Sequence, residues 1–148
     1  MAQPRFRGDR LRAAREAAGL TEKDLTLILE LSGPYRIKQW ERGIERPQPR
    51  FVPRLAEAVR IHPLDLLDVD PEDPPLAAIR IAAGQGTKQM SGPGMSFMTY
   101  QRIEDARSNT EVTDEMITAI AETLRTEPSR IEAAILRTRR DHAANHIQ

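Results

Sequence analysis

The chain has no cysteine, few aromatic side chains and no long apolar run. Of its 148 residues, 4% are aromatic: one tryptophan, two tyrosines and three phenylalanines. The absence of cysteine excludes disulfides and thiolate metal sites. No apolar run approaches the roughly 18 residues of a membrane-spanning helix, so no membrane partner is expected. With so few large apolar side chains, the chain can form two modest hydrophobic cores but not one large core.

The N-terminal twelve residues carry four arginines and no apolar stretch, so they do not resemble a secretory signal. We therefore expect a cytoplasmic protein. The sequence contains no glycine loop suited to hold a phosphate and no nucleophile with a neighbouring base. We expect no metal, no cofactor, no small-molecule substrate and no enzymatic activity.

An internal repeat with a period of about 65 residues is the main feature that is present. Six residues between Leu11 and Gly19 recur in register between Leu76 and Gly84, and residues 55–60 resemble residues 120–125. A repeat of this length, with short helical patterns inside each copy, predicts two small helical domains in tandem. The predicted fold class is all-α, with a first domain at residues 1–67, a linker at 68–75 and a second domain at 76–148.

The net charge of zero hides a division of charge along the chain. Residues 1–62 hold 13 basic and 8 acidic side chains, which gives a net charge of +5. Residues 63–75 hold five acidic side chains and no basic one, whereas residues 76–148 hold nine of each. A basic first domain, an acidic Pro-rich linker and a neutral second domain indicate that only the first domain is suited to a polyanionic partner.

Helix start and stop signals divide the first copy into five short helices. They are expected at residues 9–18, after residue 21, and at 34–41, 51–59 and 63–67. Asp9 is expected to cap the first helix, and Thr21 to cap the second in a capping box with Asp24. In the third helix, Ile37 and Trp40 are predicted to face inward.

The second copy is altered between its first helix, at residues 76–83, and its later ones. A short helical segment at 87–91 is followed by Gly92-Pro93-Gly94, which breaks any helix. Ser96 is expected to cap a helix through Ala106, and Thr113 to cap one over residues 114–123. A longer C-terminal helix is expected from Thr126 to about Ala144, either packed on its own domain or paired with a second chain.

The stretch from Thr21 to Gly43, with the Pro-rich connection at 45–56, resembles the helix-turn-helix of the phage repressor and Cro family, also called the XRE family. The resemblance covers residues 8–67 well and 76–132 weakly. It implies two tandem lambda-repressor-like bundles, each with a helix-turn-helix. It also implies a regulator of transcription, a repressor, which binds double-stranded DNA as a two-fold dimer with its third helix in the major groove.

The outward side chains of the third helix are the predicted DNA contacts. By the resemblance, Gln39 and Tyr35 occupy base-contact positions, and glutamine suits an adenine edge. Basic side chains in and around this helix are expected to contact phosphates: Arg36, Lys38, Arg50, and in the N-terminal arm Arg5, Arg7 and Arg10. The alternative is a solvated helical face with no ligand.

Two charged pairs are expected to be structural. In the family, an arginine of the first helix pairs with the glutamate that closes the recognition helix, which implies a pair between Arg15 and Glu41. The second copy retains both residues, as Arg80 and Glu104. Their mostly apolar surroundings indicate partly buried ion pairs that fix one helix against the other.

The second copy presents different residues at the equivalent outward positions: Phe97, Met98, Gln101 and Arg102. Phe97 and Met98 are unusual for a surface that reads DNA but common in protein interfaces. They favour a homodimer or a protein partner bound through the second domain, while a second DNA-reading head and a purely structural domain stay open. The rival for the whole chain is a protein-binding adaptor or antitoxin-like module.

Overall fold

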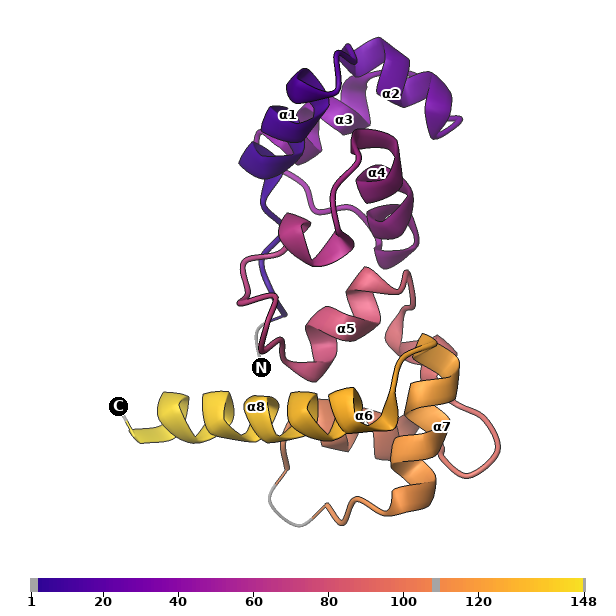
Figure 1. The fold of residues 1–148 in the computed structure, drawn as a ribbon, viewed down its shortest axis with the longest axis vertical. Helices are drawn as coiled ribbons and strands as arrows, with labels where there is room; N and C mark the ends of the chain where they lie inside the picture. Colours follow the sequence, from indigo (N-terminus) through magenta and orange to yellow (C-terminus); the bar gives the residue numbers. More distant parts are fainter. Residues whose placement is uncertain (1–2, 108–109, 148) are drawn as a thin grey trace.

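The computed structural model describes residues 3–107 and 110–147, and in these ranges every regular element is helical (Figure 1). The elements in chain order are α1 (Gly8–Ala17), α2 (Glu22–Ile28), α3 (Tyr35–Glu41), the 3-10 helix η1 (Pro49–Phe51), α4 (Val52–Val59), η2 (Pro63–Leu66), α5 (Leu76–Ala82), η3 (Thr87–Met90), α6 (Phe97–Glu104), α7 (Asp114–Leu124) and α8 (Pro128–Ile147). The predicted all-α class is confirmed.

Side-chain caps begin three of these helices at the predicted residues. Thr21 Oγ1 accepts a hydrogen bond from the Asp24 N–H at 3.0 Å, and Asp24 Oδ2 accepts one from the Thr21 N–H at 2.8 Å. Ser96 starts α6 and Thr113 starts α7 through the same type of bond. Each cap satisfies N–H groups that the first helical turn leaves without a partner.

The prediction that Asp9 caps α1 is wrong. The helix begins at Gly8, and Asp9 lies in its first turn, where its carboxylate accepts bonds of 2.9 and 2.7 Å from Arg7. The preceding chain is fixed elsewhere, because the Arg7 N–H donates to the Leu66 carbonyl at 2.6 Å. Hydrogen bonds from the Arg7 guanidinium lower the pKa of Asp9 to about 2.

Two further helix ends differ from the prediction. The α6 helix stops at Glu104 rather than at Ala106, because Ala106 adopts the left-handed conformation with φ 56° and its N–H returns to the Ile103 carbonyl. The C-terminal helix α8 starts at Pro128 and runs to Ile147, three residues past its expected end. Proline at the first helical position explains the start, since it needs no N–H partner there.

Two hydrophobic cores follow the two sequence copies, and α5 belongs to both. Ala78 and Ile81 are buried in the first core, whereas Leu76 and Ile79 are buried in the second. Figure 1 shows α5 between the two halves of the molecule. The expected boundary at residues 75 and 76 is therefore not a break in packing, and a fragment that ends before α5 loses part of the first core.

The acidic segment at 68–75 is held at both ends by arginines. Asp68 accepts a bond of 3.3 Å from Arg7, and the Asp73 carboxylate accepts bonds from Arg137 at 3.0 Å and Arg140 at 2.8 Å. Pro74, which follows Asp73, is buried. The acidic side chains thus join the N-terminal segment on one side and α8 on the other.

Arg60, which follows α4, has a left-handed backbone with φ 62°, and the equivalent Arg125 after α7 has φ 53°. A side chain in this conformation costs about 1 kcal/mol relative to glycine. Arg60→Gly is therefore expected to raise the free energy of unfolding by about 1 kcal/mol, measured by urea denaturation. Glu57→Gly, within α4, is the matched control and should lower it by about the same amount. Equal losses for both variants would contradict the role of the left-handed residue.

Candidate nucleic-acid interface

The third helix separates its apolar and polar side chains by face. Ile37 and Trp40 are buried, with exposed fractions of 0% and 1%, while Tyr35 is 65% exposed. Lys38 is exposed and Gln39 half-buried on the outer side. The Gln39 Nε2 donates a hydrogen bond to the Tyr35 Oη at 3.3 Å. The two residues predicted at base-contact positions therefore lie together, one turn apart on α3.

Two arginines, one on α3 and one on η1, stack on the aromatic rings of Trp40 and Phe51. The Cζ of Arg36 lies 5.5 Å from the ring centroid of Trp40 and 5.0 Å from that of Phe51. The Cζ of Arg50 lies 4.8 Å from the Phe51 centroid, and the two rings are 5.3 Å apart. Cations over aromatic faces are attracted by the negative ring face. The stack therefore holds two guanidinium groups beside α3, and neither has a carboxylate partner within the described residues.

Further cations without an ion pair in the described part of the chain lie past the end of α3. Arg42 and Arg46 are exposed there and line a surface hollow together with Arg5. The sequence reasoning did not single out Arg42 and Arg46. The signal that points to them is the spacing of arginines at 42, 46 and 50, directly after the polar helix.

Arg7 and Arg10 were expected to contact phosphates, but both are bonded within the protein. Arg7 pairs with two carboxylates, as described above, and Arg10 Nη1 donates to the carbonyls of Asp65 and Leu67 at 3.2 and 3.3 Å. These bonds fasten the N-terminal segment to η2, because the acidic segment after residue 63 folds back onto it. We therefore leave both arginines out of the candidate interface.

The same buried ion-pair network occurs in both copies. Arg15 donates to Glu41 through Nε at 2.6 Å and Nη2 at 3.0 Å, and its Nη1 donates to the Leu20 carbonyl at 2.9 Å. Arg80 donates twice to Glu104, at 2.8 Å each, and its Nη1 donates to the Gln85 carbonyl at 3.0 Å. Gln85 is the repeat equivalent of Leu20. The first pair fixes α1 against α3, and the second pair fixes α5 against α6.

The second network is more deeply buried than the first. The side chains of Arg80 and Glu104 are 1% and 7% exposed, and Tyr100 adds a hydrogen bond from its Oη to Glu104 Oε2. Burial raises the pKa of Tyr100 well above its usual value, so the phenol stays a donor. In the first copy, the aligned position is the apolar Ile37. In both copies the network joins two helices through a two-bonded arginine and carboxylate pair.

The outward face of α6 differs in chemistry from that of α3. Met98 is 59% exposed and Arg102 is exposed, but Phe97 is half-buried. The Gln101 Nε2 is engaged with Asp105 Oδ1 at 3.2 Å. Of the four residues predicted for this face, two are open to solvent, and the described residues show no arginine stacked on an aromatic ring beside α6.

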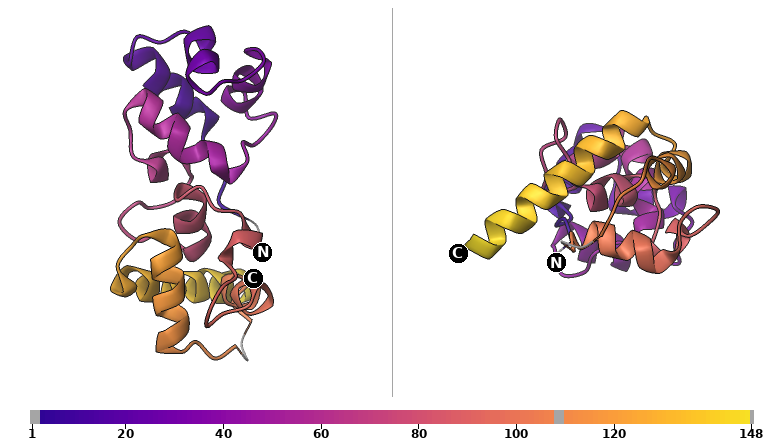
Figure 2. Two further views of the ribbon diagram at one scale, coloured as in Figure 1. Left: turned by 90° about the vertical axis from the view of Figure 1, so that its right-hand side faces the viewer. Right: turned by 90° about the horizontal axis from the view of Figure 1, so that it is seen from below.

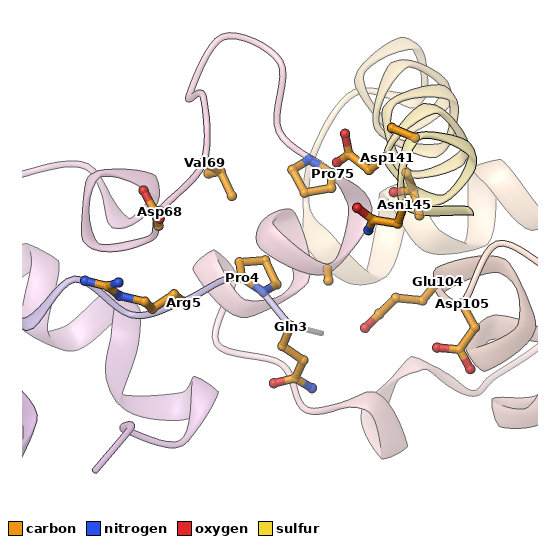
Figure 3. A pocket seen from close by; sticks show the side chains of 13 residues that line it. Gln3, Pro4, Arg5, Asp68, Val69, Pro75, Glu104, Asp105, Asp141 and Asn145 are labelled. Atoms are coloured by element: carbon orange, nitrogen blue, oxygen red, sulfur yellow. The ribbon is translucent and has the colours of Figure 1, made fainter. Parts of the chain in front are cut away.

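A cavity of about 360 Å³ lies where the N-terminal segment, the acidic segment, α6 and α8 meet (Figure 3). Its lining holds four carboxylates and Arg5, and each carboxylate has a partner. Asp68 and Glu104 bind arginines, Asp105 accepts from Gln101, and Asp141 accepts from Arg137 at 2.8 Å. Because its polar lining is engaged in bonds within the protein and it lies away from α3, we leave this cavity out of the candidate interface.

The chain matches no protein-family model, and comparisons with curated proteins and with solved structures gave no match. Within the ranges that the structure describes, no three side chains of the metal-binding types come together, and no helix has the length and apolar character needed to cross a membrane. The interpretation of function therefore depends on α3 and the cations around it.

Proposed function

We propose that the chain is a sequence-specific DNA-binding regulator of transcription, a repressor, with two tandem lambda-repressor-like helix-turn-helix bundles. The observation that carries the proposal is the outer face of α3, where Tyr35 and Gln39 are hydrogen-bonded to each other, together with the guanidinium groups of Arg36 and Arg50 that are stacked on Phe51. The resemblance of residues 8–67 to the phage repressor and Cro family supports the same function. In this proposal α3 enters the major groove of double-stranded DNA.

Each group on this face has a chemical role in such a complex. The Gln39 amide can donate and accept at once, which matches the N6 and N7 edge of adenine. Tyr35 holds the amide in place and can touch a thymine methyl group. Arg36, Arg50 and the exposed Lys38 contact phosphates, and the counterions that they release make binding depend on salt. The net charge of +5 on residues 1–62 attracts the duplex.

Gln39→Ala is expected to cost about 1–3 kcal/mol in binding to a duplex enriched from a random library by the full-length protein. The loss should be confined to that duplex, because a base contact contributes nothing on random DNA. Arg36→Ala should instead weaken binding to both duplexes and reduce the salt slope by about one unit. Fluorescence anisotropy titrations at several salt concentrations measure both effects, with circular dichroism as the check that each variant is folded.

The control is Arg102→Ala, since Arg102 occupies on α6 the position of Gln39 on α3. If α3 alone reads the sequence, this variant keeps the wild-type affinity for the enriched duplex. Equal losses for Gln39→Ala on the enriched and random duplexes would remove the base-reading role of Gln39. A tenfold or greater loss for Arg102→Ala would assign DNA reading to α6 as well.

A protein-binding module is the second candidate function, and the exposure of Met98 on α6 favours it. An apolar side chain that is 59% exposed beside the half-buried Phe97 suits a protein partner better than a phosphate backbone. Selection from a random DNA library distinguishes the two candidate functions, because a module that binds only proteins would enrich no duplex. DNA enrichment together with an unaffected Met98→Asp variant would favour DNA reading by α3.

A further inference from the structure

The last helix is longer than its packing requires. Its 20 residues bury Ile131, Ala134, Ile135 and Thr138, and from residue 139 to residue 145 no side chain is buried. Figure 2 shows α8 lying across the second half of the molecule, with its C-terminal end projecting beyond it. The second half of α8 thus buries no side chain, although Asp141, Ala144 and Asn145 line the cavity beside the N-terminal segment.

The face of α8 opposite to its buried stripe carries an exposed apolar side chain. Leu136 is 54% exposed, and the exposed Ala133 and Ala143 lie three residues before it and seven after it. These spacings place all three residues on one side of the helix. Because Ala133 and Ala143 are small, they leave room on this face for a second helix to pack against Leu136.

We propose that this face binds the same face of α8 in a second copy of the chain, in an antiparallel pair with its two-fold axis at Leu136. The charges beside Leu136 indicate that the partner is a second copy of the chain. Glu132 precedes Leu136 by four residues and Arg139 follows it by three, so both lie on the same flank of the helix. Both side chains are exposed, and neither has an ion pair of 4.0 Å or less within the described residues of its own chain, although Arg139 lines a hollow that Glu111 also lines.

The two-fold axis brings these charges together. With a rise of about 1.5 Å per residue, Glu132 of one copy and Arg139 of the other lie within about 1.5 Å of the same height along the pair. The symmetry forms this contact twice, as in any isologous interface. On the other flank Arg140 reaches back to Asp73, at 2.8 Å, and the position that it faces across the axis is the small Ala133.

The charges also exclude the parallel arrangement. A parallel pair would place Arg139 of each copy next to Arg140 of the other, which is a repulsive contact made twice. The neutral charge of residues 76–148 adds no general repulsion between copies. The proposed surface is separate from α3 and from the outward residues of α6, so the inference does not depend on DNA binding.

The absence of cysteine makes a direct test simple. Leu136→Cys places two thiols at the two-fold axis, and mild oxidation should convert the full chain into a covalent dimer of twice 16.7 kDa. Leu27→Cys on α2 is the control, because Leu27 is the same residue type and is at least as exposed, at 66% against 54%. We expect the Leu136 variant to cross-link at least ten times faster than the Leu27 variant on non-reducing gels. Equal rates would overturn the proposal.

Charge reversal tests the pairing itself. Glu132→Arg and Arg139→Glu should each raise the dimer dissociation constant at least tenfold in sedimentation equilibrium, and the combined variant should restore the wild-type value. Glu122→Arg, an exposed reversal on α7, is the control and should change nothing. Both altered positions are exposed, and thermal melts establish that each variant is folded. A wild-type chain that is monomeric at tens of micromolar, or a combined variant that stays dissociated, would overturn the proposal.

Discussion

Glu104→Ala is expected to lower the free energy of unfolding by about 3–5 kcal/mol, because it leaves the buried Arg80 guanidinium without a counter-charge. The Arg80 side chain is 1% exposed, so water cannot replace the two hydrogen bonds that Glu104 accepts. The Tyr100 hydroxyl loses its acceptor in the same variant. Removing one partner of a buried pair costs more than the pair contributes, since the remaining charge stays desolvated.

Urea denaturation followed by circular dichroism measures this loss. Glu122→Ala, on the exposed side of α7, is the matched control and should change stability by less than about 0.5 kcal/mol. The triple variant Arg80→Met, Glu104→Leu, Tyr100→Phe should recover much of the loss, because no buried charge is then left without a partner. A loss below about 1 kcal/mol for Glu104→Ala would contradict the buried clamp between α5 and α6.

Gly8→Ala is expected to destabilise the protein by about 3 kcal/mol, the upper end of the cost of overpacking. A methyl group at Gly8 would lie 2.0 Å from the Trp40 carbonyl oxygen and 2.7 Å from that of Glu41. These oxygens belong to the backbone of α3, so no side-chain rotation relieves the clash. The start of α1 and the end of α3 would have to separate, which would also strain the pair between Arg15 and Glu41.

Gly33→Ala is the control for this prediction, because nothing lies within 4 Å of the position that its methyl group would take. It should leave the unfolding free energy within about 0.5 kcal/mol of the wild type. Thermal melts of the two alanine variants, compared with the wild type, measure the difference. A Gly8→Ala protein as stable as Gly33→Ala would mean that α1 and α3 do not approach each other as described.

Local signals allowed the sequence to predict most helix positions. A cap such as Thr21 with Asp24, or Ser96 before α6, acts within one turn, so neighbouring residues suffice to recognise it. The inward positions of Ile37 and Trp40 follow from helical periodicity for the same reason. The internal repeat allowed the remaining helices and the second ion pair to be predicted, because the position of a residue in one copy indicates its equivalent in the other.

The sequence could not predict which partner each buried or charged residue has. Periodicity indicates that Ala78 and Leu76 are buried, but not that α5 packs them into different cores. Arg7 resembled a free phosphate ligand until the fold brought Asp68, 61 residues away, beside it. Asp9 has the residue type of a helix cap, yet the chain before it is fixed by a bond to η2, so the helix starts one residue earlier.

In the candidate site too, the sequence could not predict which residues contact each other. The outward residues of α3 could be selected from the sequence, but the stacking of Arg36 over Trp40 and Phe51 depends on α3 and η1 meeting in space. Arg42 and Arg46 come near Arg5 only because the connection after α3 and the N-terminal segment meet at one hollow. The outer face of α8 stands out only when the buried stripe on its other side is known.

The measurement that tests the account most directly is the affinity of the full-length protein for its enriched duplex relative to a random duplex of equal length. We expect the enriched duplex to bind at least 10³-fold more tightly at physiological salt, the lower limit of the range for specific DNA-binding proteins, with an affinity that falls steeply as salt rises. In the Gln39→Ala variant this ratio should fall by about tenfold or more. A ratio near one, or no duplex enriched at all, would contradict DNA reading by α3.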